Sequence, residues 1–382
     1  MYKSIYRYKY IIHHIKTNTN TRQETKKMCD KYVIGYWVRE KKRQKLNFDD
    51  FEKVCRTEGF TLKLVDIYSS LESQGPLHVF LHKLVDLLAH AEGGNGNAIN
   101  VTSKLQEYID KHPELIVIDP LENVKKLHNR YKYYKIIQES IHFNDVFIPN
   151  FVELKSTNVL ENMRILKQSG VKFPFVCKSL LAHGSSDAHK MMVIFNSKDL
   201  KDCQPPCVAQ DFVNHNAILY KLFVVGKNFH VVERPSLRNF YSDDCASLST
   251  LFFNTHDISK PDSKSKWSIL SEEHIPTVVK PNVEILEKIV KGITKIFGLH
   301  LVGIDIVIEN DTKKYAIIDV NVFPGYDGYP NFFQHLIDSI KQLLTERKAL
   351  RQNSKSCTLR KSHSDDLDSG FESDEKKKCS TK

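Results

Sequence analysis

Apolar and polar positions in the first third of the chain alternate between strand and helix patterns. Short runs rich in β-branched and aromatic residues predict buried strands, whereas apolar residues spaced three and four apart predict helices. The expected strands are Tyr32–Val38, Phe60–Ile67 and Leu115–Ile118, the helices are Asn47–Glu58, Pro76–Ala91 and Lys104–Lys111, and Arg39–Lys45 is a basic loop. This alternation indicates a parallel α/β lobe over residues 32–120.

The pattern changes after residue 120. A helix-rich stretch, Leu121–Ser140, is followed by short strands with few helices between them, which indicates a small antiparallel lobe. Those strands are Phe173–Lys178, Met191–Phe195, Cys207–Val213, Leu219–Val225 and Phe229–Glu233. The rest comprises a polar loop over 243–275, helix Pro281–Phe297, a hairpin of Leu301–Asn310 with Tyr315–Val320, and helix Asn331–Leu344. The expected fold class is α/β (α+β), with further lobes over 121–213 and 214–346.

The positive charge of the chain lies at its two ends. The net charge is +10, but residues 1–31 hold eight Lys or Arg against two acids and residues 347–382 hold ten against six, so the body between them is neutral. A neutral body argues against nucleic acid binding. We expect the basic extension 1–31 and the charged tail 347–382 to be disordered.

Cysteine usage and hydropathy bear on the compartment. The eight cysteines are scattered without a Cys-x-x-Cys pair, which is typical of a reduced cytoplasmic protein rather than of a zinc site or a disulfide framework. No apolar run approaches the roughly 18 residues that a membrane helix needs. We therefore expect a cytoplasmic protein that binds no membrane. The sequence does not determine the oligomeric state, and a monomer is the default expectation. Mitochondrial targeting by the basic residues 1–16 is the alternative.

The most informative segment is an apolar hairpin that carries acids. Asp305 lies inside the strand Gly303–Ile308, and Asp319 and Asn321 lie in Tyr315–Asn321. With a three-residue loop between the strands, Asp305 faces Asp319, and Asn321 points the same way as Asp319. Two carboxylates and one amide oxygen make a hard-oxygen site suited to Mg²⁺. The alternative is that Asp305 pairs with a buried lysine or the backbone while Asp319 faces solvent.

The usual phosphate-binding loops are missing, since the sequence holds neither Gly-x-x-x-x-Gly-Lys-[Ser/Thr] nor Gly-x-Gly-x-x-Gly. Lys178 instead ends an apolar strand, and Lys221 lies inside another. Each alone is compatible with an edge lysine that extends its ammonium to water. Beside a metal site, both are interpreted as ligands of ATP phosphates. The polar loop 182–189 is a candidate cover for phosphates, and Cys207–Val213 is a candidate adenine-binding link between lobes.

Short motifs of specific sequence follow one another over residues 33–344. They are Gly35-Tyr-Trp37, Glu40-Lys-Lys42, Gly75-Pro-Leu77, His82-Lys-Leu84, Tyr108-Ile-Asp-Lys-His-Pro113, Phe173-Pro-Phe-Val-Cys-Lys178, Ala182-His-Gly184, Asn214-His-Asn-Ala-Ile-Leu-Tyr-Lys221, Arg234-Pro-Ser-Leu237, Gly303-Ile-Asp305 and Asp319-Val-Asn-Val-Phe-Pro-Gly325. In this order the segment resembles the inositol-tetrakisphosphate 1-kinase family, also called the inositol 1,3,4-trisphosphate 5/6-kinase family, of the ATP-grasp superfamily. The loop 183–189 is one residue longer than the family pattern, and Val85 stands where Thr is more usual.

The resemblance implies a fold and a set of roles. In an ATP-grasp fold, the lobe 32–120 would bind the inositol phosphate, and the central lobe 121–213 and C-terminal lobe 214–346 would sandwich ATP, with the metal site in the latter. ATP, as co-substrate, would contact Arg130, Lys178, Gln210, Asp211, Phe212, Val213, Lys221, Ser236, Thr255 and Ser259. Mg²⁺, expected as two ions, would be held by Asp305, Asp319 and Asn321. The inositol phosphate would contact Lys42, Lys83, His189, Lys221, Asn321 and Gly325, and the catalytic residues would be Lys178, Lys221 and Asp305.

The implied activity is transfer of the ATP γ-phosphoryl group to a hydroxyl of a soluble inositol tris- or tetrakisphosphate. Two alternatives are an ATP-grasp carboxylate–amine ligase and a catalytically silent inositol phosphate-binding scaffold. The basic segment Arg39–Lys45 with Lys83 favours a polyphosphate acceptor over a carboxylate. The intact acidic hairpin favours an enzyme over a scaffold. The sequence leaves open which hydroxyl reacts, whether phosphate is exchanged between inositol phosphates, and which group acts as general base.

Overall fold

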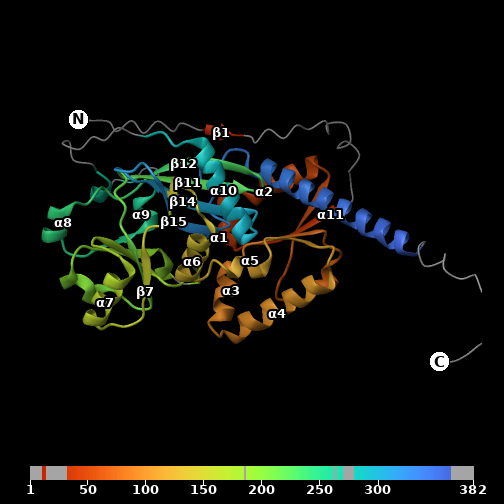
Figure 1. Ribbon diagram of the computed structural model, residues 1–382. Coiled ribbons are helices and arrows are strands. Elements are labelled where there is room, and N and C mark those ends of the chain that lie inside the picture. Colours follow the sequence, from red (N-terminus) through yellow and green to blue (C-terminus); the bar gives the residue numbers. More distant parts are fainter. Residues whose placement is uncertain are drawn as a thin grey trace, which may run out of the picture. The chain divides into compact units, whose positions relative to one another are not determined.

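A computed structural model of the chain describes residues 11–13 and 32–362, apart from 185, 261–262, 264 and 270–278; it leaves out the side chains of 11–13, 186–187, 242 and 353–362. Residues 1–339 form one compact unit and residues 340–382 a second. The first unit contains three sheets. In Figure 1, its orange region with α3 and α4 and its yellow-green region with α7 lie on opposite sides of the view.

The N-terminal sheet contains four parallel strands in the order β3-β2-β4-β5. The strands are β2 (Tyr32–Trp37), β3 (Phe60–Leu64), β4 (Val79–His82) and β5 (Ile116–Ile118). They are joined by α1 (Glu40–Leu46), α2 (Phe48–Thr57), the short 3-10 helix Glu72–Gln74, α3 (Val85–Glu92) and α4 (Gly96–Lys111). The expectation of a parallel α/β lobe is confirmed.

Two local expectations for this lobe were wrong. The segment Arg39–Lys45 is not a loop, because helix α1 begins at Glu40. The segment Pro76–Ala91 is not one helix, because β4 occupies Val79–His82 before α3 begins. All four residues of β4 are buried between β2 and β5. Periodicity does not separate a short buried strand from a buried helical segment, so the neighbouring strands decide.

The central sheet contains five antiparallel strands in the order β13-β9-β8-β10-β7. The strands are β7 (Phe151–Leu154), β8 (Phe175–Ser179), β9 (Lys190–Ile194), β10 (Cys207–Asp211) and β13 (Leu251–Asn254). Helix α7 (Val159–Ser169) covers one face through Leu166, which packs in a buried cluster with Phe175 and Leu200. Short 3-10 helices lie at Ser186–His189 and Ser197–Asp202.

The third sheet contains six strands in the order β1-β12-β11-β14-β15-β6, and only β6 is parallel to its neighbour. The strands are β1 (Ile11–His13), β6 (Val146–Phe147), β11 (Ile218–Val225), β12 (Asn228–Pro235), β14 (Leu301–Ile308) and β15 (Tyr315–Val322). The remaining helices are α5 (Leu121–Lys125), α6 (Arg130–Ser140), α8 (Ser242–Ser247), α9 (Thr255–Ile258), the 3-10 helix Lys266–Ser268, α10 (Val283–Phe297) and α11 (Phe332–Ser362).

The strands between residues 173 and 235 do not form one antiparallel lobe as expected. β8, β9 and β10 belong to the central sheet, whereas β11 and β12 belong to the six-stranded sheet. Residues 243–275 were expected to be loop, but they contain α8, β13 and α9, and β13 pairs with β9 across the expected boundary at 213. Conversely, β6 lies within the expected lobe 121–213 but pairs with β15 in the six-stranded sheet. Pairing between distant segments, which local pattern does not encode, decides these exchanges.

The ends of the chain also differ from expectation. Disorder was predicted for 1–31, but Ile11–His13 pairs with β12; residues 1–10 and 14–31 lie outside the described residues. Helix α11 continues past Leu344 to Ser362, so the predicted disorder was wrong for 347–362, and 363–382 lie outside the described residues. Strong helix formers without Gly or Pro follow Leu344. Within the described residues, no helix is long and apolar enough to span a bilayer.

Candidate active site

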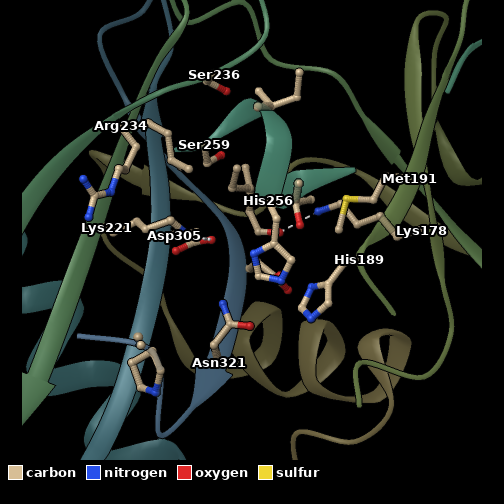
Figure 2. Close-up of a pocket in the computed structure, with 18 of the residues that line it drawn as sticks. Lys178, His189, Met191, Lys221, Arg234, Ser236, His256, Ser259, Asp305 and Asn321 are labelled. Carbon is tan, nitrogen blue, oxygen red and sulfur yellow. Dashed lines mark hydrogen bonds and ion pairs between the residues drawn. The ribbon is translucent and has the colours of Figure 1, made fainter. Parts of the chain in front are cut away.

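A cavity of about 920 Å³ gathers side chains from all three sheets, and every residue assigned a role in the sequence analysis lines it. This volume lies in the range of about 300–1,000 Å³ that is usual for small-molecule sites. Figure 2 looks into this cavity, with residues of the central and six-stranded sheets around it. The structure therefore brings the predicted site residues together, while their individual roles stay predictions.

The acidic hairpin has the predicted register. Asp305 on β14 lies directly opposite Asp319 on β15, and Gly303 lies opposite Asn321. The register shifts between Asp305 and Ile306, so the bulge follows the acidic pair. Asp305, Asp319 and Asn321 all line the cavity. The prediction that the two acids face each other is confirmed.

Lys221 balances the charge of Asp305. It lies opposite Asp305 on the neighbouring strand β11, and its Nζ donates to Asp305 Oδ2 at 2.7 Å. Figure 2 shows this contact across the two strands. Burial raises the pKa of Asp305, Lys221 opposes the rise, and the facing Asp319 adds to it. The lysine thus offsets the cost of burying a carboxylate beside another.

Asp319 is held by different groups. The hydroxyl of Tyr133 donates to it, and Arg130 Nε lies 3.8 Å from its Oδ1. Burial alone would raise the pKa of Asp319, but Arg130 and then Lys178 outweigh burial, and the pKa is lowered. The pKa values of the two facing acids are therefore shifted in opposite directions, so Asp319 is held as the anion.

Lys178 is fixed at the wall of the cavity by three oxygen atoms. Its Nζ donates to Gln210 Oε1 and to the Ile318 carbonyl, both at 2.7 Å. A third contact, at 3.0 Å, is to the hydroxyl of Tyr134. Burial lowers the pKa of Lys178 to about 8. The amine is thus held rigidly next to Asp319, where a bound anion would favour its charged form.

The oxygen atoms of the hairpin fit a hard divalent cation. Among the residues that the structure describes, no group of three or more His, Cys, Asp and Glu could hold a metal ion. Protein oxygens for an ion here would come from Asp305, Asp319 and the amide of Asn321. Mg²⁺ usually keeps several waters and is bound by one or two carboxylates plus substrate phosphates. A sparse site of this kind therefore suits Mg²⁺ that arrives with a nucleotide.

The segment Gln210–Val213 forms one wall of the cavity. The carboxylate of Asp211 is turned away from a ligand, because it accepts from Asn150 Nδ2 at 2.9 Å and from the Lys172 backbone N–H at 2.7 Å. Gln210 Nε2 is buried with no hydrogen-bond partner among the described residues. A ligand acceptor there would satisfy it.

Ser236 presents an acceptor to the cavity. Burial lowers the pKa of His215 to about 4, so the ring is neutral. Its Nδ1 lies 2.6 Å from the Val213 carbonyl and must donate to it, so its Nε2 accepts from the Ser236 hydroxyl at 2.7 Å. The lone pairs of Ser236 are left for a ligand. Thr255 and Ser259, at the two ends of α9, also line the cavity.

The two terminal nitrogens of Arg130 are bonded to the protein backbone, whereas its Nε has no hydrogen-bond partner among the described residues. Its Nη1 donates to the carbonyls of Ser179 at 2.7 Å and Leu181 at 3.2 Å. Its Nη2 donates to the carbonyl of Ala188 at 3.0 Å. Arg130 therefore holds both ends of the loop 182–189.

The middle of that loop rests on helix α3. The Gly184 N–H donates to Asp86 Oδ1 at 3.1 Å, and its carbonyl accepts from His90 Nε2 at 2.8 Å. Gly184 has φ +88°, and a Cβ there would lie 3.1 Å from the Cβ of Ala89. Glycine is thus required both by the left-handed backbone and by the close approach to α3.

Two lysines from the N-terminal sheet meet the turn after the hairpin. Lys83 Nζ donates to the Phe323 carbonyl at 2.8 Å, and Lys42 Nζ contacts the carbonyls of Phe323 and Pro324. Burial, together with the nearby Lys83 and Lys45, lowers the pKa of Lys42 to about 6. Burial also lowers the pKa of Lys83 to about 8. Clustered amines with such pKa values make a site for a multiply charged anion.

Gly325 gives this turn the space it needs. A Cβ at Gly325 would lie 2.5 Å from Asp327 Oδ2 and 3.2 Å from Lys45 Nζ. Those two groups form an ion pair at 2.8 Å. Arg234 Nη2 donates to the Asp327 carbonyl at 2.7 Å, so the turn is fixed from a second side.

Sequence reasoning missed five residues that shape this cavity. Tyr133 and Tyr134 lie on α6, in a stretch for which the sequence analysis predicted helix and no role. Arg234 and His215 stood inside recognised motifs without a role. His256 lies in a segment expected to be loop. The two tyrosines share one signal, a buried hydroxyl next to a residue that was predicted to bind a ligand. Only tertiary contacts reveal this signal.

Comparisons with known proteins agree with this geometry. Residues 33–124 match the model of the inositol 1,3,4-trisphosphate 5/6-kinase pre-ATP-grasp domain, and residues 140–342 match that of the family's ATP-grasp domain. The inositol-tetrakisphosphate 1-kinases of Danio rerio and Xenopus laevis are each 41% identical over 314 residues, 81% of this chain and 78% of theirs. Inositol-tetrakisphosphate 1-kinase 1 of Zea mays is 28% identical over 313 residues, 81% of this chain and 87% of its own.

Solved structures give the fold. D-cycloserine synthetase DcsG superposes with a TM-score of 0.52 at 11% identity and covers 82% of this chain and 99% of its own. The ATP-grasp ligase PsnB with its minimal precursor gives a TM-score of 0.50 at 12% identity, with 81% and 99% covered. Identities this low show the fold alone. Together with the two family models, they establish that the chain has the ATP-grasp fold and belongs to the inositol 1,3,4-trisphosphate 5/6-kinase family.

Proposed function

We propose that this chain transfers the γ-phosphoryl group of ATP to a hydroxyl of a soluble inositol tris- or tetrakisphosphate. One observation carries the proposal. A single cavity has an acidic hairpin with two strand lysines, Lys178 and Lys221, on one side, and the half-buried lysines Lys42 and Lys83 on the other. A nucleotide triphosphate suits the first side and a polyphosphorylated acceptor suits the second.

ATP would lie between the central sheet and the six-stranded sheet. The backbone of Gln210–Val213 would contact the adenine edge, and Lys178 and Lys221 would contact the phosphates. Asp305, Asp319 and Asn321 would hold Mg²⁺, as two ions, which neutralises charge on the transferred phosphoryl group. Arg130 would hold the loop 182–189 against the site through Nη1 and Nη2, and its Nε, which has no hydrogen-bond partner among the described residues, would be left to contact ATP.

The acceptor would lie against Lys42, Lys83, His189 and Gly325. Its hydroxyl oxygen bonds to the γ-phosphorus while the bond from that phosphorus to the ADP oxygen breaks, without a covalent enzyme intermediate. Catalysis would rest on positioning and charge neutralisation, because a loose phosphoryl-transfer transition state needs little covalent help from the protein.

The wider setting belongs to the same proposal. We assign acceptor binding to residues 32–120 and nucleotide binding to residues 121–346, with β13 and β6 exchanged between the two ATP-grasp lobes. We also propose a cytoplasmic monomer that binds no nucleic acid. Free thiols support a reducing compartment, since Cys55, Cys177, Cys203, Cys207 and Cys245 form no disulfide.

The test is ADP release with Mg²⁺-ATP and a panel of inositol tris- and tetrakisphosphates, followed by product analysis. Inositol phosphate-dependent ADP release with a product carrying one more phosphate is expected. Release that requires a carboxylate and an amine instead would identify a ligase. Inositol phosphate binding without ADP release would identify a scaffold.

A further inference from the structure

Two imidazole rings face each other across the cavity. His189 ends the 3-10 helix Ser186–His189, and His256 lies on α9, and their ring centroids are 4.2 Å apart at an angle of 55°. Figure 2 shows both rings pointing into the space beside Asn321 and Asp305. The sequence analysis assigned a substrate contact to His189 and nothing to His256.

The position of His256 is set by the helix that carries it. Ile258 is 6% exposed and packs in a buried cluster with Phe195 and Leu251, which anchors α9 to the central sheet. Asn254 caps the helix by accepting from the His256 backbone N–H at 2.9 Å. His256 and Ile258 both line the cavity, and Figure 2 shows the His256 ring inside it.

The ring of His256 has no structural task within the described residues. Its side chain is exposed, and neither ring nitrogen has a hydrogen-bond partner among the residues that the structure describes. A histidine kept for packing would be buried with its nitrogen atoms satisfied, as His215 is.

Three lysines act on His256. Partial desolvation lowers the pKa of this exposed residue, and Lys45, Lys221 and Lys260 also lower it, against a smaller opposing effect of Asp257. Burial also lowers the pKa of His189, and His256 contributes to that effect. The three lysines are each also paired with a carboxylate, of Asp327, Asp305 and Asp257 respectively, and the two neutral imidazoles add ring N–H donors beside them.

We propose that His256, together with His189, binds a phosphate group of the phosphorylated acceptor through ring N–H donors. This inference rests on the proposed function and adds a ligand to its acceptor side. Lys45, which faces His256, lies on α1 in the N-terminal sheet region, next to the lysines Lys42 and Lys83. That neighbourhood favours the acceptor over the nucleotide as the source of the phosphate.

The test measures acceptor and nucleotide binding separately by calorimetry, so that no turnover is needed. The full chain and its His256→Ala, His256→Gln and His142→Gln variants are titrated with inositol 1,3,4-trisphosphate alone and with ADP alone. His142 is an exposed histidine whose ring contacts the Glu139 carbonyl outside the cavity, so its variant is the matched control.

His256→Ala is expected to weaken inositol phosphate binding at least about tenfold, the effect of losing a hydrogen bond to a charged group, and to leave ADP binding within about twofold. His256→Gln, which keeps a neutral donor, is expected to lie between. An inositol phosphate affinity that changes less than about threefold in both variants overturns the inference, and so does an equal loss for ADP. Retained ADP binding shows that a variant is folded. If His256→Ala does not fold, the inference is tested with His256→Gln alone. A parent chain that binds no inositol phosphate refutes the proposed function instead.

Discussion

The low pKa of Lys42 predicts that acceptor binding takes up protons. With a pKa of about 6 in the unliganded protein, Lys42 is only about 3% protonated at pH 7.5, and Lys83, with a pKa of about 8, is about 75% protonated. A polyanion beside them restores both pKa values toward that of an ordinary lysine. Binding at pH 7.5 should therefore take up about 1.2 protons at these two lysines, of which about 1.0 is taken up by Lys42 and about 0.2 by Lys83.

Calorimetry in buffers of different ionisation enthalpy measures this number directly. The slope of the observed enthalpy against the buffer ionisation enthalpy gives the protons taken up. Phosphate groups of the ligand titrate with pKa values of about 6 and contribute their own term. Comparison with Lys42→Met removes that term, and the variant should take up about one proton fewer than the parent chain.

A lysine outside the cavity provides the control. Lys53 lies on α2 with an exposed side chain that pairs with Asp50, and Lys53→Met should leave the proton count unchanged. If Lys42→Met still binds the inositol phosphate and its proton count falls by less than about 0.3, Lys42 is already charged before binding and the reasoning is refuted.

The same depressed pKa affects stability with a definite sign. Between about pH 6 and the ordinary lysine value of about 10.5, the unfolded chain holds more protons on this residue than the folded one. The free energy by which Lys42 destabilises the folded state is therefore largest below pH 6 and vanishes above pH 10.5. Unliganded Lys42→Met should melt higher than the parent chain at pH 7, with a gap that narrows as the pH rises.

Three further changes test the rest of the site. Asp305→Asn should lower turnover at saturating Mg²⁺ at least about 100-fold, because it removes a preorganised charge from the reaction centre; an active variant in ADP-release assays would refute the metal site. Tyr134→Phe removes the 3.0 Å contact to Lys178 and should lower kcat/KM for ATP about 3- to 20-fold. Tyr131→Phe, on the same helix, should leave kcat/KM unchanged. An equal loss of kcat/KM in both variants would show that the tyrosines act through packing. Asp119→Ala deletes a buried carboxylate that accepts from two backbone N–H groups at the start of β14 and should destabilise the fold by about 2–4 kcal/mol in urea unfolding; a loss under about 1 kcal/mol would contradict this role.

The register of the hairpin could be predicted from the sequence because side chains in a strand alternate with a period of two. Once a short loop is placed, Asp305 must face Asp319 and share a face with Asn321. A lysine inside an apolar strand is likewise informative by itself, because burying an ammonium is costly without a partner. Lys178 and Lys221 satisfy this logic through oxygen partners in the cavity.

The exchange of strands could not be predicted in the same way. β4 is a short apolar run that is also compatible with a helix, and the strands on both sides of it decide the matter. β13 pairs with β9, and β6 pairs with β15, across large separations in sequence. Such pairing depends on which edges meet in the folded chain, and local composition carries little information about that.

The sequence by itself determined the chemistry of the site: acids and an amide on one ribbon, lysines on apolar strands, and a basic segment after the first strand. Their spacing is local, and the alternation of strand side chains converts it into geometry. The tertiary structure alone decided how these groups are tuned. Tyr133, Tyr134 and Arg130 reach the site from a helix, so the opposite pKa shifts of Asp305 and Asp319 arise from burial and from charges distant in sequence. Those effects depend on distances of a few ångströms in space, which exist only once the sheets have packed together.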